Sequence, residues 1–272
     1  MRKIIVLLSA IALSGTIMAA QDFSSFAKHV KTNPEGKEMP YRLLSPAKME
    51  KGVKYPLFVV LHGMGRRGTD NEQQLTIGAH VFVNEMNREK YPCFVLYPQT
   101  PETFVELVTR NGKNKGGFSM WSKNLDSPEM AETTTEISAY GKMVIGLIRE
   151  LIHDKAIDPD RIYLAGSSMG AYSTYHLISE FPEMFAAAAP MGGGADIRLM
   201  KNWAGKVPVW IVHGLADTIV TPENDERIIS ELKKAGADFR YTLYEGVPHN
   251  CWDKAFKEPD FLEWFFKYRK NK

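Results

Sequence analysis

Cysteine is scarce in this sequence, where Cys93 and Cys251 are the two cysteines among 272 residues. No Cys-x-x-Cys or His-Glu-x-x-His spacing occurs, so the sequence predicts neither a metal site nor any other cofactor. Cys93 opens an apolar run and Cys251 lies in a late loop, which we expect to place them at opposite ends of a sheet. Exported proteins can form disulfides, but this separation favours two unpaired thiols.

Net charge is also low. The chain carries 34 Lys and Arg against 32 Asp and Glu, a formal net charge of +2. This balance offers no basic field to a polyanion, which argues against nucleic acid as the main partner. No apolar run of about 18 residues follows the N-terminal segment, so no membrane span is expected after it. A content of 44% hydrophobic and 24% charged residues is typical of a globular protein.

The first 20 residues have the layout of a targeting segment. Two cations precede an apolar stretch from Ile4 to about Leu13, and small residues follow. This order predicts a secretory signal peptide over residues 1–20, with a short membrane anchor as the alternative. We therefore expect an exported protein, periplasmic or secreted, whose mature part is residues 21–272.

Short apolar runs alternate with longer segments of helical spacing. The runs predict buried strands at Tyr55–Leu61, Cys93–Tyr97, Arg161–Ala165, Phe185–Pro190, Val207–Val212 and Phe239–Tyr244. The longer segments predict helices at Thr133–His153, Pro222–Ala235 and Phe261–Tyr268. Such alternation predicts an α/β fold with a mostly parallel central sheet and helices on both faces. No repeat or linker divides residues 21–272, so we expect a single catalytic domain there.

Ser168 lies in a Gly-x-Ser-x-Gly motif that runs from Gly166 to Gly170. The motif follows a predicted strand and precedes an apolar helical stretch, which is the context of a nucleophile elbow. Its tight turn leaves no room for side chains at the flanking positions, which explains the two glycines. The alternative is an ordinary Gly/Ser turn. The pattern predicts Ser168 as a catalytic nucleophile and no chemistry for Ser167.

A serine hydroxyl needs a base to activate it. Three histidines follow Ser168 in the chain. His176 falls inside the helix after the elbow, and His213 ends a strand, where a packed residue is expected. His249 lies in a loop after the last predicted strand, the position that a loop-borne base occupies. We therefore predict His249 as the base, with a histidine that packs the loop as the alternative.

The base in turn needs an acid that orients it. Asp217 comes just after a predicted strand, in a loop at the carboxyl edge of the sheet, where sites form in α/β folds. Asp196 is the stronger rival, because it also follows a strand, and Asp253 is the weaker one. The order serine, acid, histidine along the chain favours Asp217.

An oxyanion hole requires two backbone N–H groups near the nucleophile. Met169 follows Ser168 directly, and Met64 lies in the Gly-rich loop after the strand at Tyr55–Leu61. These two residues are the predicted donors. The same loop also fits Gly-x-Gly-x-x-Gly, but the residues after it are polar and form no apolar helix, which argues against a dinucleotide site.

These residues together resemble the α/β-hydrolase superfamily, and more closely the exported esterases of carbohydrate esterase family 1 and the related group called predicted peptidases. The resemblance rests on the stretches LHGMGRRGTDNEQQLTIGA, DPDRIYLAGSSMGAYSTYHLISEFPEMFAAAAPMGGGAD and VPVWIVHGLADTIVTPENDERIISELKKAGADFRYTLYEGVPHNCWDKAF. It covers most of residues 39–264. It implies an α/β-hydrolase fold, with the triad on Ser168, Asp217 and His249 and the oxyanion donors on Met64 and Met169.

Two tryptophans are candidates for substrate binding. Trp121 precedes the long helix, in a segment that the resemblance places near the site, and it either stacks on a ring of the substrate or covers the core. Trp252 follows His249 closely and either walls the pocket or packs the loop. The cations Arg110, Lys113 and Lys115 lie before Trp121, where a solvated loop is favoured over a site for an acidic polymer.

The sequence thus predicts an exported serine esterase that uses a Ser-His-Asp triad and no cofactor. Its expected substrate is a small-molecule or polysaccharide ester, with acetyl or feruloyl groups on glycans favoured by the resemblance. A serine peptidase of the same fold is the alternative among enzymes. The alternative from another class is a non-catalytic glycan-binding protein on a hydrolase scaffold, against which the intact order of the triad argues.

Overall fold

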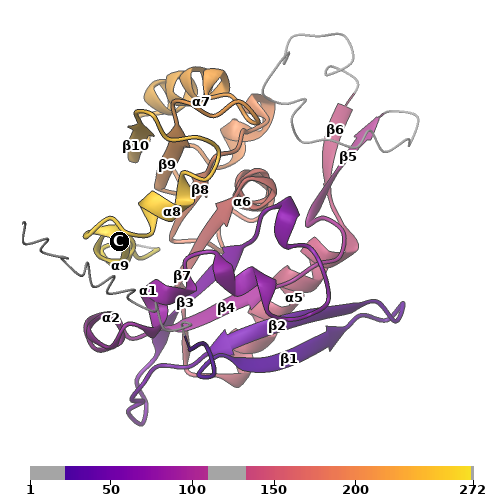
Figure 1. Ribbon diagram of the computed structural model, residues 1–272, viewed down its shortest axis with the longest axis vertical. Helices are drawn as coiled ribbons and strands as arrows, with labels where there is room; N and C mark the ends of the chain where they lie inside the picture. The colour runs from indigo at the N-terminus through magenta and orange to yellow at the C-terminus, as the bar shows by residue number, and fades with distance from the viewer. Residues whose placement is uncertain (1–21, 110–132, 271–272) are drawn as a thin grey trace, which may run out of the picture.

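A computed structural model describes residues 22–109 and 133–270 and shows an eight-stranded sheet in the order β1-β2-β4-β3-β7-β8-β9-β10 (Figure 1). β2 pairs antiparallel with β1 on one side and with β4 on the other. All further pairings in this order, from β4–β3 to β9–β10, are parallel. The strands span Ala27–Thr32 (β1), Glu38–Leu44 (β2), Tyr55–Leu61 (β3), Phe94–Pro98 (β4), Ile157–Ser167 (β7), Ala187–Met191 (β8), Val209–Gly214 (β9) and Phe239–Tyr244 (β10). A separate antiparallel pair joins β5 (Val105–Thr109) and β6 (Thr133–Ile137).

Helices cover both faces of the sheet. One face carries α5 (Ala139–Asp154), α6 (Met169–Glu180) and α7 (Glu223–Lys234), and the other carries α1 (Ala79–Val83), α8 (Trp252–Ala255) and α9 (Phe261–Phe266). The remaining helical segments are α2 (Glu85–Lys90), η1 (Met64–Arg66), η2 (Gln73–Thr76) and η3 (Ile197–Asn202). A hydrophobic core lies on each face of the sheet. Along β3, the side chains of Leu57 and Val59 enter one core and those of Phe58 and Val60 enter the other, because successive side chains of a strand point to opposite faces. The predicted α/β-hydrolase fold, with a mostly parallel sheet between two helical layers, is confirmed.

The predicted helix over Thr133–His153 is wrong in its first part. Residues Thr133–Ile137 form β6, and α5 begins at Ala139 after Ser138, whose side chain accepts from the Gly141 N–H. Three consecutive threonines favour a strand there, because β-branched residues fit a pleated sheet better than a helix. The strands β1 and β2 were not predicted. None of the described helices is long and apolar enough to cross a bilayer.

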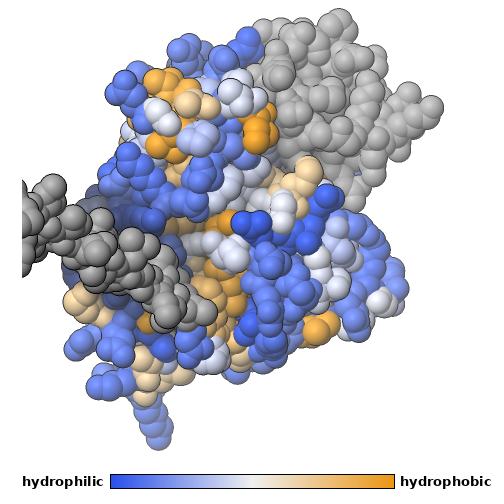
Figure 2. Space-filling view, viewed as in Figure 1, coloured by the Kyte–Doolittle hydropathy of each residue, from blue (hydrophilic) through white to orange (hydrophobic). Residues whose placement is uncertain are grey.

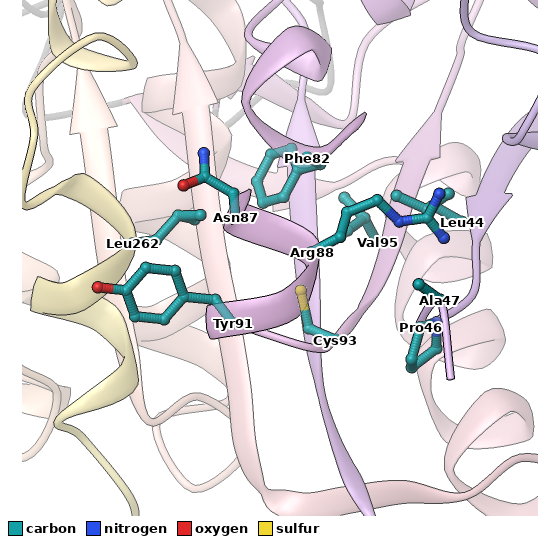
Figure 3. Close-up of a pocket in the computed structure, with 10 residues that line it drawn as sticks. All are labelled: Leu44, Pro46, Ala47, Phe82, Asn87, Arg88, Tyr91, Cys93, Val95 and Leu262. Carbon is teal, nitrogen blue, oxygen red and sulfur yellow. The ribbon is translucent and has the colours of Figure 1, made fainter. Parts of the chain in front are cut away.

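Both cysteines are buried and free, in agreement with the prediction. Cys93 lies just before β4 and lines a small pocket between α2, β4 and α9 (Figure 3). That pocket has a volume of about 10 Å³, which is about enough for one water molecule and excludes a substrate. Burial raises the pKa of Cys93 to about 12, so its thiol stays protonated at neutral pH. Cys251 lies after β10, with its thiol near the Val212 carbonyl at 3.6 Å.

The turn from β7 into α6 is closely packed against the neighbouring backbone. A Cβ on Gly166 would meet the carbonyl of Gly170, and a Cβ on Gly170 would meet the carbonyl of Leu61 on β3. Neither obstacle is a side chain that can rotate away. The reason predicted for both glycines of the motif is therefore confirmed.

Gly170→Ala is expected to destabilise the folded chain. Overpacking of this kind costs about 1–3 kcal/mol, so the midpoint of urea unfolding should fall. Gly65→Ala is the matched control, because an added Cβ there meets nothing within 4 Å. Equal midpoints for the two variants would show that the turn at Gly170 can accommodate the added methyl group.

Candidate active site

The structure joins Ser168, His249 and Asp217 in one hydrogen-bonded chain. The Nε2 atom of His249 lies 2.8 Å from the Ser168 hydroxyl, and its Nδ1 lies 2.6 Å from Oδ2 of Asp217. Asp217 can only accept when ionised, so Nδ1 carries the hydrogen and Nε2 accepts from the hydroxyl. Residues 81 and 32 positions apart in the chain thus meet in the tautomer that a general base requires.

Ser168 is held in a strained backbone conformation. It joins β7 to α6 with φ 53° and ψ −116°, and Asn71 is the other described non-glycine residue with positive φ. Such a conformation costs about 1–3 kcal/mol and persists where the surroundings impose it. Here the Ser168 N–H donates to Met191 on β8, and its carbonyl accepts from the first turn of α6. The turn directs the hydroxyl towards His249 at the edge of the sheet.

Asp217 is fixed from several sides in the loop after β9. Its Oδ1 accepts from the N–H groups of Ile219 and Val220 at 2.9 Å, which leaves Oδ2 for His249. Burial would raise the pKa of Asp217, but the contacts with His213, His249 and the two N–H groups outweigh it and hold that pKa well below its usual range. The carboxylate therefore stays ionised and oriented at neutral pH.

The predicted oxyanion donors Met64 and Met169 each stand at the start of a helical segment. Met169 opens α6 and Met64 opens η1, and N–H groups at the start of a helix have no intrahelical acceptor. The loop of Met64 approaches the nucleophile closely, since a Cβ on Gly63 would lie 3.2 Å from Cβ of Ser168. This arrangement suits an oxyanion hole.

His62 anchors that loop, a role that the sequence analysis did not assign. Its Nδ1 donates to the Gly63 carbonyl at 2.8 Å, and its Nε2 accepts from the Thr100 N–H at 3.1 Å. Burial is the main cause that lowers the pKa of His62 to about 4, so the ring stays neutral. The signal in the sequence was a histidine placed directly between a buried strand and a Gly-rich loop.

A pocket of about 570 Å³ opens over Ser168 and lies within the usual range for a small-molecule site. Its apolar wall comprises Met64, Ile77, Tyr172, Ile219, Val220 and Trp252. Arg66 also lines it and is held by its Nε–H, which donates to Oγ1 of Thr76 at 2.6 Å. The face shown in Figure 2 is mostly hydrophilic, with smaller hydrophobic patches near its top, in its middle and towards its lower edge.

Trp252 packs edge-on against His249. Its ring lies 5.2 Å from the His249 ring at 84°, and the side chain lines the pocket. Trp121 and the cations Arg110, Lys113 and Lys115 lie outside the described residues.

The rival candidates for the acid and the base make contacts other than those of this hydrogen-bonded chain. Asp196 caps η3 and pairs with Arg198, and Asp253 accepts from Asn250. His176 is buried within α6. Among residues 22–109 and 133–270, no group of three His, Cys, Asp or Glu side chains is arranged to hold a metal ion.

Comparison with known proteins shows related hydrolases. Carboxylesterase SOBER1 of Arabidopsis thaliana is 24% identical over 77% of this chain and 88% of its own length. The bifunctional acetylxylan esterase/xylanase XynS20E of Neocallimastix patriciarum is 31% identical over 48% of this chain and 17% of its own. The crystal structure of a thermostable esterase aligns with a TM-score of 0.77 and 33% identity, over 90% of this chain and 64% of that one. This chain therefore spans less than two thirds of the last two proteins.

The fold and these relatives define the class: the chain is a hydrolase of the α/β-hydrolase type, with esterases among its relatives. Residues 73–260, more than half of the sequence, match the model of the dienelactone hydrolase family. The chain belongs to this family.

Proposed function

We propose that the chain is an exported serine esterase in which Ser168, His249 and Asp217 form the catalytic triad. The observation that carries the proposal is the hydrogen-bonded chain from Asp217 through His249 to the Ser168 hydroxyl, which ends in the pocket. A serine in a strained turn with an oriented imidazole beside it has the arrangement of an activated nucleophile.

In the proposed reaction the Ser168 oxygen attacks the ester carbonyl while its proton moves to Nε2 of His249. Asp217 stabilises the imidazolium that forms, and the N–H groups of Met64 and Met169 donate to the oxyanion. The imidazolium returns its proton to the leaving alcohol. Water then attacks the acyl-enzyme with His249 again as base and releases the carboxylic acid.

The proposed substrate is an acetyl or feruloyl ester on a glycan or a fragment of one. The acetylxylan esterase among the relatives supports this class, and Trp252 adds an aromatic wall on which a ring can pack. Export by a signal peptide over residues 1–20 is part of the proposal, because polymeric glycans lie outside the cell.

A panel of substrates tests this function on purified residues 21–272. We expect release of acetate from acetylated xylan or of ferulate from methyl ferulate, together with turnover of short para-nitrophenyl esters. A short peptide amide serves as the comparison. Cleavage of the amide alone would replace the esterase by a peptidase.

A fluorophosphonate label identifies the nucleophile independently of the acyl group. Wild type should be labelled at Ser168, and Ser168→Ala should not. Absence of label together with no turnover on the whole panel would favour the non-catalytic binding protein instead.

A further inference from the structure

His213, near the end of β9, lies directly behind the triad acid. Its Nε2 atom lies 2.8 Å from the Val220 carbonyl and 3.4 Å from Oδ2 of Asp217. On the other side of the ring, Nδ1 lies 2.9 Å from Oδ2 of Asp225 on α7. The side chains of His213, Asp217 and Asp225 are each at most 1% exposed. A buried imidazole thus lies between two buried carboxyl groups.

The Nε2 hydrogen of His213 has an acceptor in the Val220 carbonyl, whereas Nδ1 lies close to Asp225 without the alignment of a hydrogen bond. The contact with Asp225 is therefore one of charge, and a cation on the ring attracts both carboxylates. Burial and the charge of Asp217 raise the pKa of Asp225, and a cation on His213 opposes that rise, because two ionised carboxylates in this interior would otherwise repel each other. Burial opposes a charge on His213, but the contacts with Asp217 and Asp225 outweigh it and raise its pKa to about 10.

Other titratable groups face the cluster from neighbouring elements. Three of these groups are two phenols and one thiol. None of the three carries a positive charge, and burial raises the pKa of each. His249 contacts Asp217 from the loop after β10. These other groups are Tyr175 on α6, Tyr241 on β10 and Cys251 before α8.

We propose that His213 is a permanently protonated positioning residue that holds the triad acid, with Asp225 as its counter-ion. The proposal rests on the proposed function and adds two actions to it. The donation to the Val220 carbonyl fixes the loop whose N–H groups hold Asp217. The positive charge keeps Asp217 ionised and compensates the second carboxylate.

Nitrogen-15 NMR of the histidine side chains tests the protonation state in the full chain. We expect one ring with both nitrogens protonated at pH 8, which is assigned to His213 by its loss in His213→Gln. In Asp225→Asn this ring should carry a single N–H at the same pH. A neutral His213 ring in the wild type at pH 7, as in a neutral pair with protonated Asp225, would overturn the proposal.

Kinetics test the positioning role. His213→Gln retains an N–H for the Val220 carbonyl but removes the charge. We expect kcat on para-nitrophenyl acetate to fall about 10- to 100-fold, the usual effect of losing a group that orients a reacting side chain, with little change in KM. The acid limb of kcat/KM should move to higher pH, because losing a cation makes every nearby group easier to protonate.

The double variant His213→Gln/Asp225→Asn removes both charges and keeps the side-chain sizes. If compensation of charge is the role, it should recover most of the lost kcat and return the acid limb towards its wild-type position. If the double variant instead loses kcat by the combined effect of the two single variants, the proposed pairing is contradicted.

His176→Gln is the matched control, since His176 is also buried and its pKa is lowered by burial to about 4. It should reduce thermal stability without moving the acid limb. If His213→Gln behaves in the same way, His213 only packs the interior and the proposal is wrong. The NMR result needs no turnover, so failure of the proposed function, seen as no turnover on the panel and no label at Ser168, is distinguished from failure of this inference.

Discussion

Ser168→Ala is expected to lower kcat/KM on short aryl esters by about 10⁴- to 10⁶-fold, the loss that follows removal of a nucleophilic serine. The substitution removes the oxygen that attacks the carbonyl in the proposed reaction, and with it the hydroxyl that lies 2.8 Å from Nε2 of His249. Substrate binding should persist, because the pocket wall is unchanged. Initial rates with para-nitrophenyl acetate, measured at high enzyme concentration, give the size of the loss.

The matched control is Ser179→Ala on the same helix. The Ser179 hydroxyl is buried and donates to the Tyr175 carbonyl at 2.8 Å, so its removal tests the loss of a buried hydroxyl without touching the site. Its kcat/KM should stay within about threefold of the wild type, since a lost neutral hydrogen bond costs stability of about 1 kcal/mol and no chemistry. Activity in Ser168→Ala close to that of Ser179→Ala would remove Ser168 as the nucleophile.

Asp217→Asn is expected to lower kcat by about 10⁴-fold, as in other enzymes with an oriented histidine base. The amide oxygen can still accept from Ile219 and Val220, so the loop should keep its shape. The amide nitrogen would then face Nδ1 of His249 and favour the tautomer with the hydrogen on Nε2. In that tautomer the ring cannot accept the proton of Ser168.

Asp196→Asn serves as the comparison, because Asp196 was the main rival for the acid. In the structure it caps η3 and pairs with Arg198, so we expect a change in stability with kcat retained. A large loss of kcat in Asp196→Asn and none in Asp217→Asn would assign the acid the other way. Circular dichroism of both variants shows whether each chain is folded.

The parallel part of the fold could be predicted because the strands β3, β4, β8 and β9 are buried on both faces. Runs such as Tyr55–Leu61 and Val207–Val212 are apolar throughout, which is a strong local signal. The β1 strand was missed because its residues are mostly exposed and polar, so it lacks that signal. The boundary between β6 and α5 was missed because Ile137 fits the helical spacing, although the preceding threonines favour a strand.

The residues of the candidate site could be chosen from the sequence where local patterns mark them. Ser168 has a motif of five residues, and Met64 and Met169 follow from the loops around it. The support behind the triad was not predictable in the same way. His213 was read as a packed residue, and nothing in the spacing shows that Asp225, twelve positions further on, would turn towards it from α7. Such pairings depend on how a helix docks on the sheet.

The three residues of the site come from segments that meet only when distant strands have paired. Ser168 and His249 are separated by 81 positions, and β7, β8, β9 and β10 must align in parallel between them. Parallel pairing over such separations requires closure of long loops and is slow compared with the formation of local helices. Recovery of catalysis after denaturation therefore reports completion of the sheet, whereas recovery of the helical signal can precede it.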